Sequence, residues 1–324
     1  MNRWTRVLAA TLLTGVAGGC GSSERDPKLL RVGHFPNLTH AQGLIGHART
    51  DGGKKSFESR LPAGTRIEWY VYNAGPSAME AILSGALDLA YVGPNPALNA
   101  HMRTKGDEVR VVAGSARGGA GLVVPAASTA KVPADFRGKR IATPQLGNTQ
   151  DVACRAWLTA GGLKVTQTGG DATIVPTQNP DQLDLFRRGS VDAVWTVEPW
   201  VARLEIEGGG RLLVEEPEAL TTVLVASARS LRERPEMVRS FVAAHRELTE
   251  WIVANPEDAR REVGEAVARI AGAKLPPEVA EKAWSRLRFG SDVSVAEFET
   301  FVTAARTAGF LPDAVPLTRL VEKP

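Results

Sequence analysis

Four short segments of the sequence gather small polar side chains, and each segment lies between a predicted strand and a predicted helix. The side chains that could contact a ligand are, in chain order, Asn37, Thr39, His40, Ser77, Asn95, Asn148, Thr149 and Gln150. Most are hydroxyl or amide groups, which donate hydrogen bonds without carrying a charge. Helix N-termini add unpaired N–H groups and a partial positive charge. The pattern indicates that neutral donors bind a small oxyanion.

A purely structural role is open for each of these segments taken singly. Ser, Thr and Asn are ordinary N-cap residues, because their side-chain oxygens accept a hydrogen bond from the first turn of a helix. Four capped helices that converge on one cleft are better explained by binding. In open α/β sheets, the loops beyond the carboxyl ends of the strands form such clefts.

A carboxylate and two indole rings lie at the end of a later predicted strand. Glu198 could accept a hydrogen bond from an amino group of a ligand, while Trp195 or Trp200 packs against the apolar part of that ligand. Glu198 could equally cap a helix or pair with Arg203. Both interpretations stay open at this point. A carboxylate near the ligand also favours a monoanion over a dianion, because like charges repel.

Catalytic and metal-binding motifs are absent from the sequence. It contains no G-x-S-x-G, H-E-x-x-H, P-loop or C-x-x-C pattern. His40 and His47 lie seven residues apart and could share a helical face, but the five histidines do not form a set of metal ligands. The formal net charge of +3 gives no reason to expect nucleic acid as a partner. We therefore predict a binding protein without catalytic residues, metal or cofactor.

One motif occurs twice in the chain, and each position of the second copy lies 104 residues after its counterpart in the first. The positions that correspond are Pro76, Met79, Ile82, Gly85, Asp88 and Tyr91 in the first copy and Pro180, Leu183, Phe186, Gly189, Asp192 and Trp195 in the second. Proline suits the first turn of a helix and glycine suits its end. Chance agreement is the alternative, since Gly and Asp are common where a helix leads into a strand. The gapless match favours two similar α/β units with a cleft between them.

The rest of the chain supports an α/β fold with two lobes. Short β-branched runs alternate with amphipathic stretches, which is typical of mainly parallel sheets flanked by helices. A chain of 324 residues with 43% hydrophobic residues can form two cores. The predicted strands are 29–33, 66–72, 87–92 and 109–114 in the first lobe and 139–143, 172–175, 191–195 and 211–214 in the second.

Two further extended runs, 122–125 and 222–227, are predicted hinge strands at which the chain crosses between the lobes. The sequence after Pro235 has helical periodicity and is assigned to the first lobe. The predicted division places 28–116 in the first lobe, 117–225 in the second lobe and 226–324 again in the first lobe.

The N-terminus has the pattern of an export signal. Arg3 and Arg6 precede the mostly apolar run 7–16, which is too short to span a membrane, and small residues lead to Cys20. We predict a signal peptide at 1–19, lipidation of Cys20 and a polar tether at 20–27, with a plain secretory signal as the alternative. Cys154 is the second thiol and is predicted to be buried and inert; acylated Cys20 could not pair with it.

Four segments resemble a known family. They are RVGHFPNLTHAQGLIG at 31–46, AGPSAMEAILSGALDLAYVGPNPAL at 74–98, GNTQDVACRAWL at 147–158 and DAVWTVEPW at 192–200. They are similar to the solute-binding lipoproteins of ABC importers for nitrate, sulfonates and taurine, which have the type II periplasmic-binding fold. The resemblance covers nearly all of the chain that follows the predicted signal peptide.

The resemblance implies a ligand between the lobes and a closed form that docks on a membrane permease with a cytoplasmic ATPase. It implies an extracytoplasmic, lipid-anchored monomer. Carried over to this sequence, the site residues are Asn37, Thr39, His40, Ser77, Asn95, Ser115, Asn148, Thr149, Gln150 and Glu198, beside which Trp200 is the predicted packing residue.

The leading hypothesis is a receptor for a small organic anion, either an alkanesulfonate or a taurine-like compound. Nitrate, bicarbonate and pyrimidine precursors are alternative ligands within the same family. Two further hypotheses stay open: an enzyme of pyrimidine or thiamine precursor synthesis on the same fold, and a sensory receptor with the same cleft.

Overall fold

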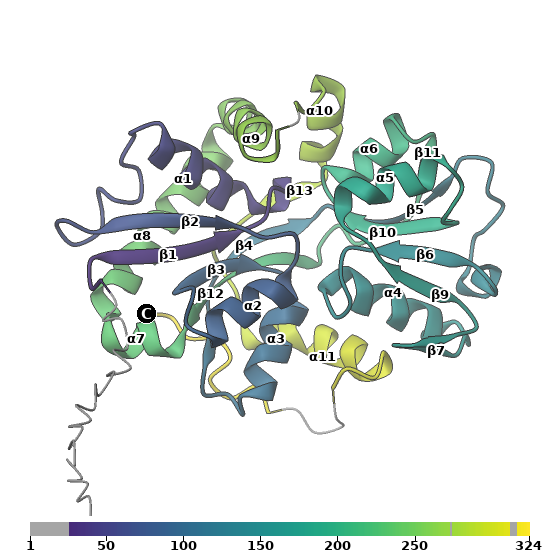
Figure 1. Ribbon diagram of the computed structural model, residues 1–324, viewed down its shortest axis with the longest axis horizontal. Helices are drawn as coiled ribbons and strands as arrows, with labels where there is room; N and C mark the ends of the chain where they lie inside the picture. The colour runs from purple at the N-terminus through teal and green to yellow at the C-terminus, as the bar shows by residue number, and fades with distance from the viewer. Residues whose placement is uncertain (1–25, 273, 312–315) are drawn as a thin grey trace, which may run out of the picture.

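Two β-sheets lie side by side in the computed structural model, and each is flanked by helices (Figure 1). The structure describes residues 26–272, 274–311 and 316–324. The predicted signal peptide, Cys20 and the first residues of the predicted tether, 20–25, lie outside the described residues. The predicted two-lobed α/β fold is confirmed.

The first lobe is built on a six-stranded sheet in the order β13-β4-β12-β3-β1-β2. Its strands are β1 (Leu29–His34), β2 (Arg66–Val71), β3 (Leu89–Val92), β4 (Val109–Gly118), β12 (Leu220–Ser227) and β13 (Leu287–Phe289). Strand β1 pairs in parallel with β2 and β3, whereas β12 and β13 pair antiparallel with their neighbours. Its helices are α1 (Ala41–Asp51), α2 (Gly75–Leu83), α3 (Pro94–Arg103), α7 (Ala228–Glu233), α8 (Pro235–Ala254) and α9 (Pro256–Ala271).

The second lobe is built on a five-stranded sheet in the order β11-β5-β10-β6-β9. Its strands are β5 (Ala120–Pro125), β6 (Arg140–Thr143), β9 (Thr173–Pro176), β10 (Ala193–Val197) and β11 (Gly210–Glu215). Strand β6 pairs in parallel with β9 and β10, and β5 pairs antiparallel with β10 and β11. Its helices are α4 (Thr149–Ala160), α5 (Asn179–Arg187) and α6 (Trp200–Ile206), beside a small hairpin of β7 (Val165–Thr166) and β8 (Gly169–Gly170). In both sheets the antiparallel pairs involve strands next to the crossings.

The chain crosses between the lobes at Gly119 and again at 216–219. Gly118 and Gly119 have φ angles of 70° and 66°, a backbone region that favours glycine. The predicted division at 116/117 and 225/226 falls inside β4 and β12, both strands of the six-stranded sheet. The run 122–125 therefore belongs to the second sheet and 222–227 to the first.

The C-terminal elements contact both lobes. Helix α10 (Pro277–Ser285) lies against α6, and α11 (Phe298–Thr307) lies against α3 and α4 (Figure 1). Three single turns of 3-10 helix complete the described elements: η1 (Leu38–His40), η2 (Pro133–Phe136) and η3 (Val295–Glu297). Separate apolar clusters pack on the sheets of the two lobes. Each lobe thus has its own core, and the C-terminal segment joins them.

The two copies of the repeated motif have the same structure. Pro76 lies in the first turn of α2 and Pro180 in the first turn of α5. Asp88 N–H donates to Arg31 O (2.9 Å), and Asp88 Oδ2 accepts from Arg31 N–H (2.9 Å). Asp192 makes the same two hydrogen bonds with Arg140, at 2.8 and 2.9 Å. In each lobe this aspartate therefore fixes the start of the neighbouring strand.

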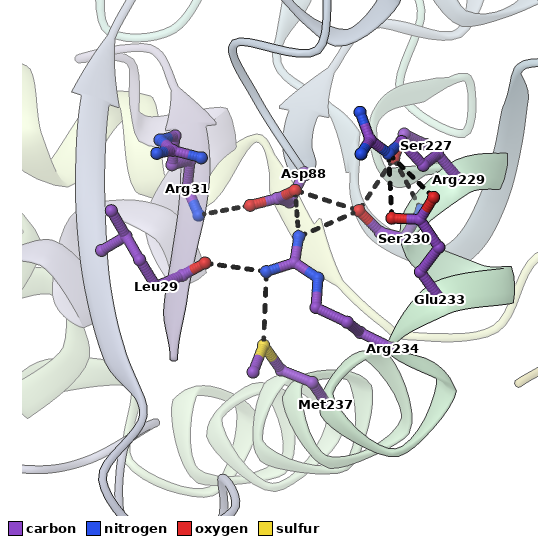
Figure 2. A network of polar contacts seen from close by, with 9 residues as sticks. All are labelled: Leu29, Arg31, Asp88, Ser227, Arg229, Ser230, Glu233, Arg234 and Met237. Atoms are coloured by element: carbon purple, nitrogen blue, oxygen red, sulfur yellow. Dashed lines mark hydrogen bonds and ion pairs between the residues drawn. The ribbon is translucent and has the colours of Figure 1, made fainter. Parts of the chain in front are cut away.

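Asp88 has additional partners that Asp192 lacks (Figure 2). The Asp88 carboxylate accepts from Ser230 Oγ (3.0 Å) and pairs with the Arg234 guanidinium, which also donates to Leu29 O (2.8 Å). The Asp88 side chain is fully buried, whereas that of Asp192 is 38% exposed and pairs with Lys139. The network therefore attaches the start of α8 to the first sheet.

Because Asp88 and Asp192 differ in burial and partners, replacing them should lower the free energy of unfolding by different amounts. Asp88→Ala leaves a largely buried guanidinium without its carboxylate, so we expect the free energy of unfolding to fall by about 3–5 kcal/mol. Asp192→Ala is the matched control, and we expect it to lose about 1 kcal/mol. Urea denaturation of both variants at pH 7 measures the two losses, and equal losses would contradict the assigned role of the Asp88 network.

Candidate functional site

A cavity lies between the lobes at the point where five helices begin. The first lobe contributes residues at the starts of α1, α2 and α3, and the second lobe contributes residues at the starts of α4 and α5. The cavity is lined by Phe35, Asn37, Thr39, His40, Asn73, Ala74, Gly75, Gly93, Pro96, Pro144, Asn148, Thr149, Gln150, Asn179, Val197 and Thr221. Its volume is about 20 Å³, which is enough for roughly one water molecule. Converging helix N-termini direct their N–H groups and dipoles toward this cavity, an arrangement whose electrostatics are suited to an anion.

The cavity lining is electrically neutral. Among the described residues that line it there is no Asp, Glu, Lys or Arg. Burial lowers the pKa of His40 well below its ordinary value, so the ring is neutral at pH 7. Since His40 Nδ1 accepts from Phe35 N–H (3.3 Å), the ring proton is on Nε2. His40 is thus a neutral donor, like the hydroxyl and amide groups around it.

Asn37 connects the two lobes across one side of the cavity. Its Oδ1 accepts from Trp200 Nε1 (3.1 Å) and from Asn179 Nδ2 (3.4 Å), both in the second lobe. Because these contacts need the lobes close together, the structure represents a closed arrangement.

Thr149 forms a second contact between the lobes at the cavity. Asn95 N–H in the first lobe donates to Thr149 Oγ1 (3.4 Å). A Cβ atom at Gly93 would collide with the same oxygen, so the missing side chain at Gly93 allows this approach. The hydroxyl accepts from Asn95, which leaves its own proton available for a ligand.

The loop before α4 is held by a buried ion pair. Asn148 Oδ1 caps the helix by accepting from Asp151 N–H (2.9 Å). The Asp151 carboxylate accepts from Gly147 N–H (2.9 Å), Thr143 Oγ1 (3.0 Å) and the Arg155 guanidinium (3.0 and 3.1 Å). These charges balance each other behind the loop, and only neutral groups of the loop reach the cavity.

Of the predicted site residues, the structure brings Asn37, Thr39, His40, Asn148, Thr149 and Gln150 together around the cavity. It places four others elsewhere. The Ser77 hydroxyl donates to Ala74 O (3.0 Å) within the first turn of α2, and the Ser115 hydroxyl donates to Gln42 Oε1 (2.7 Å). Asn95 and Trp200 line two neighbouring hollows, on the Thr149 side and the Asn37 side respectively.

Glu198 also lies outside the cavity lining and has structural partners. Its Oε2 accepts from Ala202 N–H (3.0 Å) and so caps α6, and its Oε1 pairs with Arg286 (2.9 Å). Arg203, the cation expected from the sequence, pairs instead with Glu207 (2.8 Å). The sequence left open whether the Glu198 carboxylate contacts a ligand or has a structural role. In the structure it caps α6 and pairs with a cation, and that cation is Arg286.

Several lining residues were not among the predicted ones. Asn179 stands immediately before Pro180, as Gly75 stands before Pro76, so the repeated motif could have identified it. Asn73 follows β2 and donates to Pro144 O (3.4 Å) across the lobes. Thr221 follows 216–219, where the chain returns to the first lobe, and no sequence motif marks that crossing.

Neither metal binding nor a membrane span is indicated by the described residues. No group of three or more His, Cys, Asp and Glu side chains among them is placed to hold a metal ion. Within the same part of the chain, no helix has both the length and the apolar character needed to cross a membrane. Cys154 is buried, and burial raises the pKa of its thiol.

Comparisons with known proteins agree with this geometry. The model of the NMT1-like family matches residues 23–268. The taurine-binding periplasmic protein of Escherichia coli K12 is 26% identical over 222 residues, which are 67% of this chain and 66% of that protein. A putative aliphatic sulfonates-binding protein of the same organism is 29% identical over 210 residues, or 64% and 60% of the two chains. The matched part thus spans less than two thirds of these relatives.

A solved structure shows the same fold. The alkanesulfonate-binding protein SsuA from Xanthomonas axonopodis pv. citri, bound to MOPS, superimposes with a TM-score of 0.74. The superposition covers 93% of this chain and 100% of that one at 22% sequence identity.

The environment of Glu198 predicts a specific pH dependence of stability. Burial raises the pKa of Glu198 to about 7, although Ala202 N–H and Arg286 lower it. Between the ordinary pKa of a glutamate and pH 7, the folded state therefore binds more protons at this site than the unfolded state. The contribution of Glu198 to stability falls as pH rises through this window and is constant above it.

Glu198→Gln should consequently reduce the fall in stability between the ordinary pKa of a glutamate and pH 7. The melting temperatures of the wild-type protein and the variant, measured from pH 5 to pH 8, test the expectation. Glu250→Gln is the matched control, because it removes a carboxylate that is exposed on α8 and is not among the groups that shift the pKa of Glu198. The same slope in the wild-type protein and Glu198→Gln would refute the assignment.

Proposed function

The chain belongs to the NMT1-like family, and from this premise we propose that it is the extracytoplasmic solute-binding component of an ABC importer. The proposed ligand is a small organic anion, an alkanesulfonate or a taurine-like compound, held between the lobes. The observation that carries the proposal is the cavity itself, in which neutral donors from both lobes surround one small space.

The charge of the ligand follows from the lining. Helix N-termini and neutral donors stabilise one negative charge, and no cationic side chain among the described lining residues offsets a second one. In the sequence alone, the Glu198 carboxylate is the reason to disfavour a dianion. Since Arg286 binds that carboxylate outside the cavity, the preference for a monoanion now rests on the neutral lining.

The ligand class is supported by the relatives, two of which are a taurine-binding protein and a putative aliphatic sulfonates-binding protein. The proposed partners are a membrane permease and its ATPase. We further propose an N-terminal signal peptide, a lipid anchor on Cys20 and a monomeric state; the first two concern residues outside the described part of the chain.

Capture of the ligand would proceed by hinge closure. The lobes are joined by two crossings, and the contacts of Asn37 with Trp200 and of Asn95 with Thr149 form only when the lobes approach. An anion that accepts hydrogen bonds from α2 and α4 at once would add contacts to the closed state alone. It would therefore shift the population toward closure.

The small volume of the cavity favours one second candidate, an inorganic monoanion such as nitrate or bicarbonate. A cavity of about 20 Å³ has to expand less for an ion of this size than for an organic sulfonate. An organic sulfonate needs more space for its carbon chain, and the neighbouring hollows provide it.

A thermal-shift screen of the purified protein tests the proposal. The ligands are methanesulfonate, butanesulfonate, taurine, nitrate, bicarbonate and a pyrimidine precursor. A ligand present at 100 times its Kd stabilises the folded state by about 2.7 kcal/mol. Stabilisation by sulfonates or taurine is the expected result, whereas stabilisation by nitrate, bicarbonate or the pyrimidine alone would overturn the sulfonate assignment.

We also expect Thr149→Ala to weaken ligand binding by about 1 kcal/mol, because it removes one hydrogen-bond donor from the cavity. Titration calorimetry with the ligand found in the screen measures the loss. Thr149→Ser, which keeps the hydroxyl, should retain most of the affinity. Unchanged affinity in Thr149→Ala together with lower stability would mean that Thr149 serves only as part of the contact between the lobes.

A further inference from the structure

A group of ion pairs crosses between the lobes where α10 lies against α6 (Figure 1), and none of its residues lines the cavity. Lys282 Nζ lies 3.2 Å from Glu205 Oε1, and Arg286 Nη1 lies 2.8 Å from Glu205 Oε2. Arg286 also pairs with Glu198 (2.9 Å) and lies 3.7 Å from Glu215. Two cations thus face three carboxylates outside the cavity.

The two cations are attached to the first lobe. Lys282 lies on α10, whose residues Val279 and Ala283 are buried in the core of that lobe. Arg286 directly precedes β13, which pairs antiparallel with β4 of the six-stranded sheet. Both cations therefore move with the first lobe, because core packing and backbone hydrogen bonds fix the segment that carries them.

The three carboxylates belong to the second lobe, but only two of them adjoin a crossing. Glu198 N–H donates to Gly119 O at the first crossing, and Glu215 ends β11 directly before the return crossing. Glu205 lies on α6, whose apolar face packs into the core of the second lobe. Since hinge residues absorb the rotation while the packed elements move as bodies, Glu205 is the carboxylate that moves with the second lobe when the lobes separate.

Helix α6 also provides a contact between the lobes at the cavity. Trp200, its first residue, donates from Nε1 to Asn37 Oδ1 (3.1 Å) in the first lobe. Glu205 lies on the same helix, roughly 7–8 Å further along its axis at the rise of an α-helix. Because both residues lie on one short helix, a rotation that separates Trp200 from Asn37 also moves Glu205 away from its two cations.

Partial burial strengthens the attraction between these charges. The side chains of Glu205 and Arg286 are 12% and 15% exposed, and that of Lys282 is 39% exposed. Exposed ion pairs contribute little to stability because water and salt screen them, whereas partly buried pairs are screened less. The closed arrangement therefore contains an attraction that is lost when the lobes separate.

We propose that Glu205, Lys282 and Arg286 form an interlobe latch that stabilises the closed arrangement in the absence of ligand. The latch goes beyond the proposed function, because it needs no ligand and lies outside the cavity. For a receptor that binds by closure, it would raise the affinity for every ligand by the same factor, since apparent affinity scales with the population of the binding-competent state. Selectivity among ligands would remain with the cavity.

Distances between spin labels on the two lobes of the ligand-free protein, measured by double electron–electron resonance, test the latch. The labels are attached at Ser84→Cys and Arg188→Cys, which are exposed positions directly after α2 and α5. Cys20→Ser removes one native thiol, and Cys154 is buried and so inaccessible to the label. With the latch intact, a population should have the separation that these two positions have in the closed structure.

Glu205→Gln removes the negative charge of the latch and keeps the size of the side chain. We expect the ratio of closed to open protein to fall by about fivefold, because both cations lose their partner on α6. Glu207→Gln is the matched control, since Glu207 follows the same helix, is 19% exposed and pairs with Arg203 within the second lobe (2.8 Å). It should leave the distances between the labels unchanged.

Lys282→Gln tests the latch from the first lobe and should also shift the distances toward the open form. In that background Glu205→Gln should have a smaller effect than in the wild-type protein, because residues in contact are not additive. Circular dichroism melting verifies that each variant is folded.

Three results would overturn the latch. They are a wild-type protein with only the longer distances, unchanged distances in both Glu205→Gln and Lys282→Gln, and an equal shift in Glu207→Gln. All of these measurements are made without ligand. Failure of the latch therefore leaves the proposed function standing, and failure of the ligand screen leaves the latch standing.

Discussion

The closed cleft depends on Glu198, a buried carboxylate at the meeting point of the two lobes. Its backbone N–H donates to Gly119 O (2.8 Å) at the first crossing, and its backbone carbonyl accepts from Leu38 N–H (3.1 Å) in the first lobe. Its side chain binds the start of α6 and Arg286, which follows α10. Removing a carboxylate from water costs free energy, and the raised pKa of Glu198 reflects that cost. Directional contacts to the crossing, to both lobes and to the C-terminal segment offset this cost, and they fix the relative position of the two halves of the cavity.

The charged side chains next to the cleft are paired with one another outside the cavity. Asp151 and Arg155 balance each other behind α4, and Glu198 and Arg286 balance each other beside α6. The cavity is consequently lined with neutral donors that belong to helix starts. For the receptor proposed above, this arrangement would favour release of the ligand, because helix dipoles and neutral hydrogen bonds stabilise an anion less than a buried guanidinium would. Because the donors belong to both lobes, opening the lobes would separate those of the first lobe from those of the second.

The sequence predicted the local parts of this structure well and the long-range parts poorly. The repeated motif identified two lobes because proline at a helix start, glycine at its end and aspartate before the next strand each have a local physical cause. The loops with Asn37, Thr39, His40 and 148–150 line the cavity between the lobes, where the same local pattern predicts them. The partner of Glu198 was missed because Arg286 lies 88 residues away. Ser77 and Ser115 have the right chemistry for binding, but their hydroxyls are directed to Ala74 O and Gln42, which composition alone does not reveal.

Two neighbouring spaces at the cleft are built from different parts of the chain. The cavity is lined by helix starts and by backbone positions such as Gly75 and Gly93, where a Cβ atom would collide with Pro96 or Thr149. A larger hollow beside it is lined by side chains of α4 and α11, such as Trp157 and Phe301, and by Glu216 at the return crossing. Thr149, Gln150 and Thr221 line both spaces, so the cavity and the hollow meet at the start of α4 and at the return crossing.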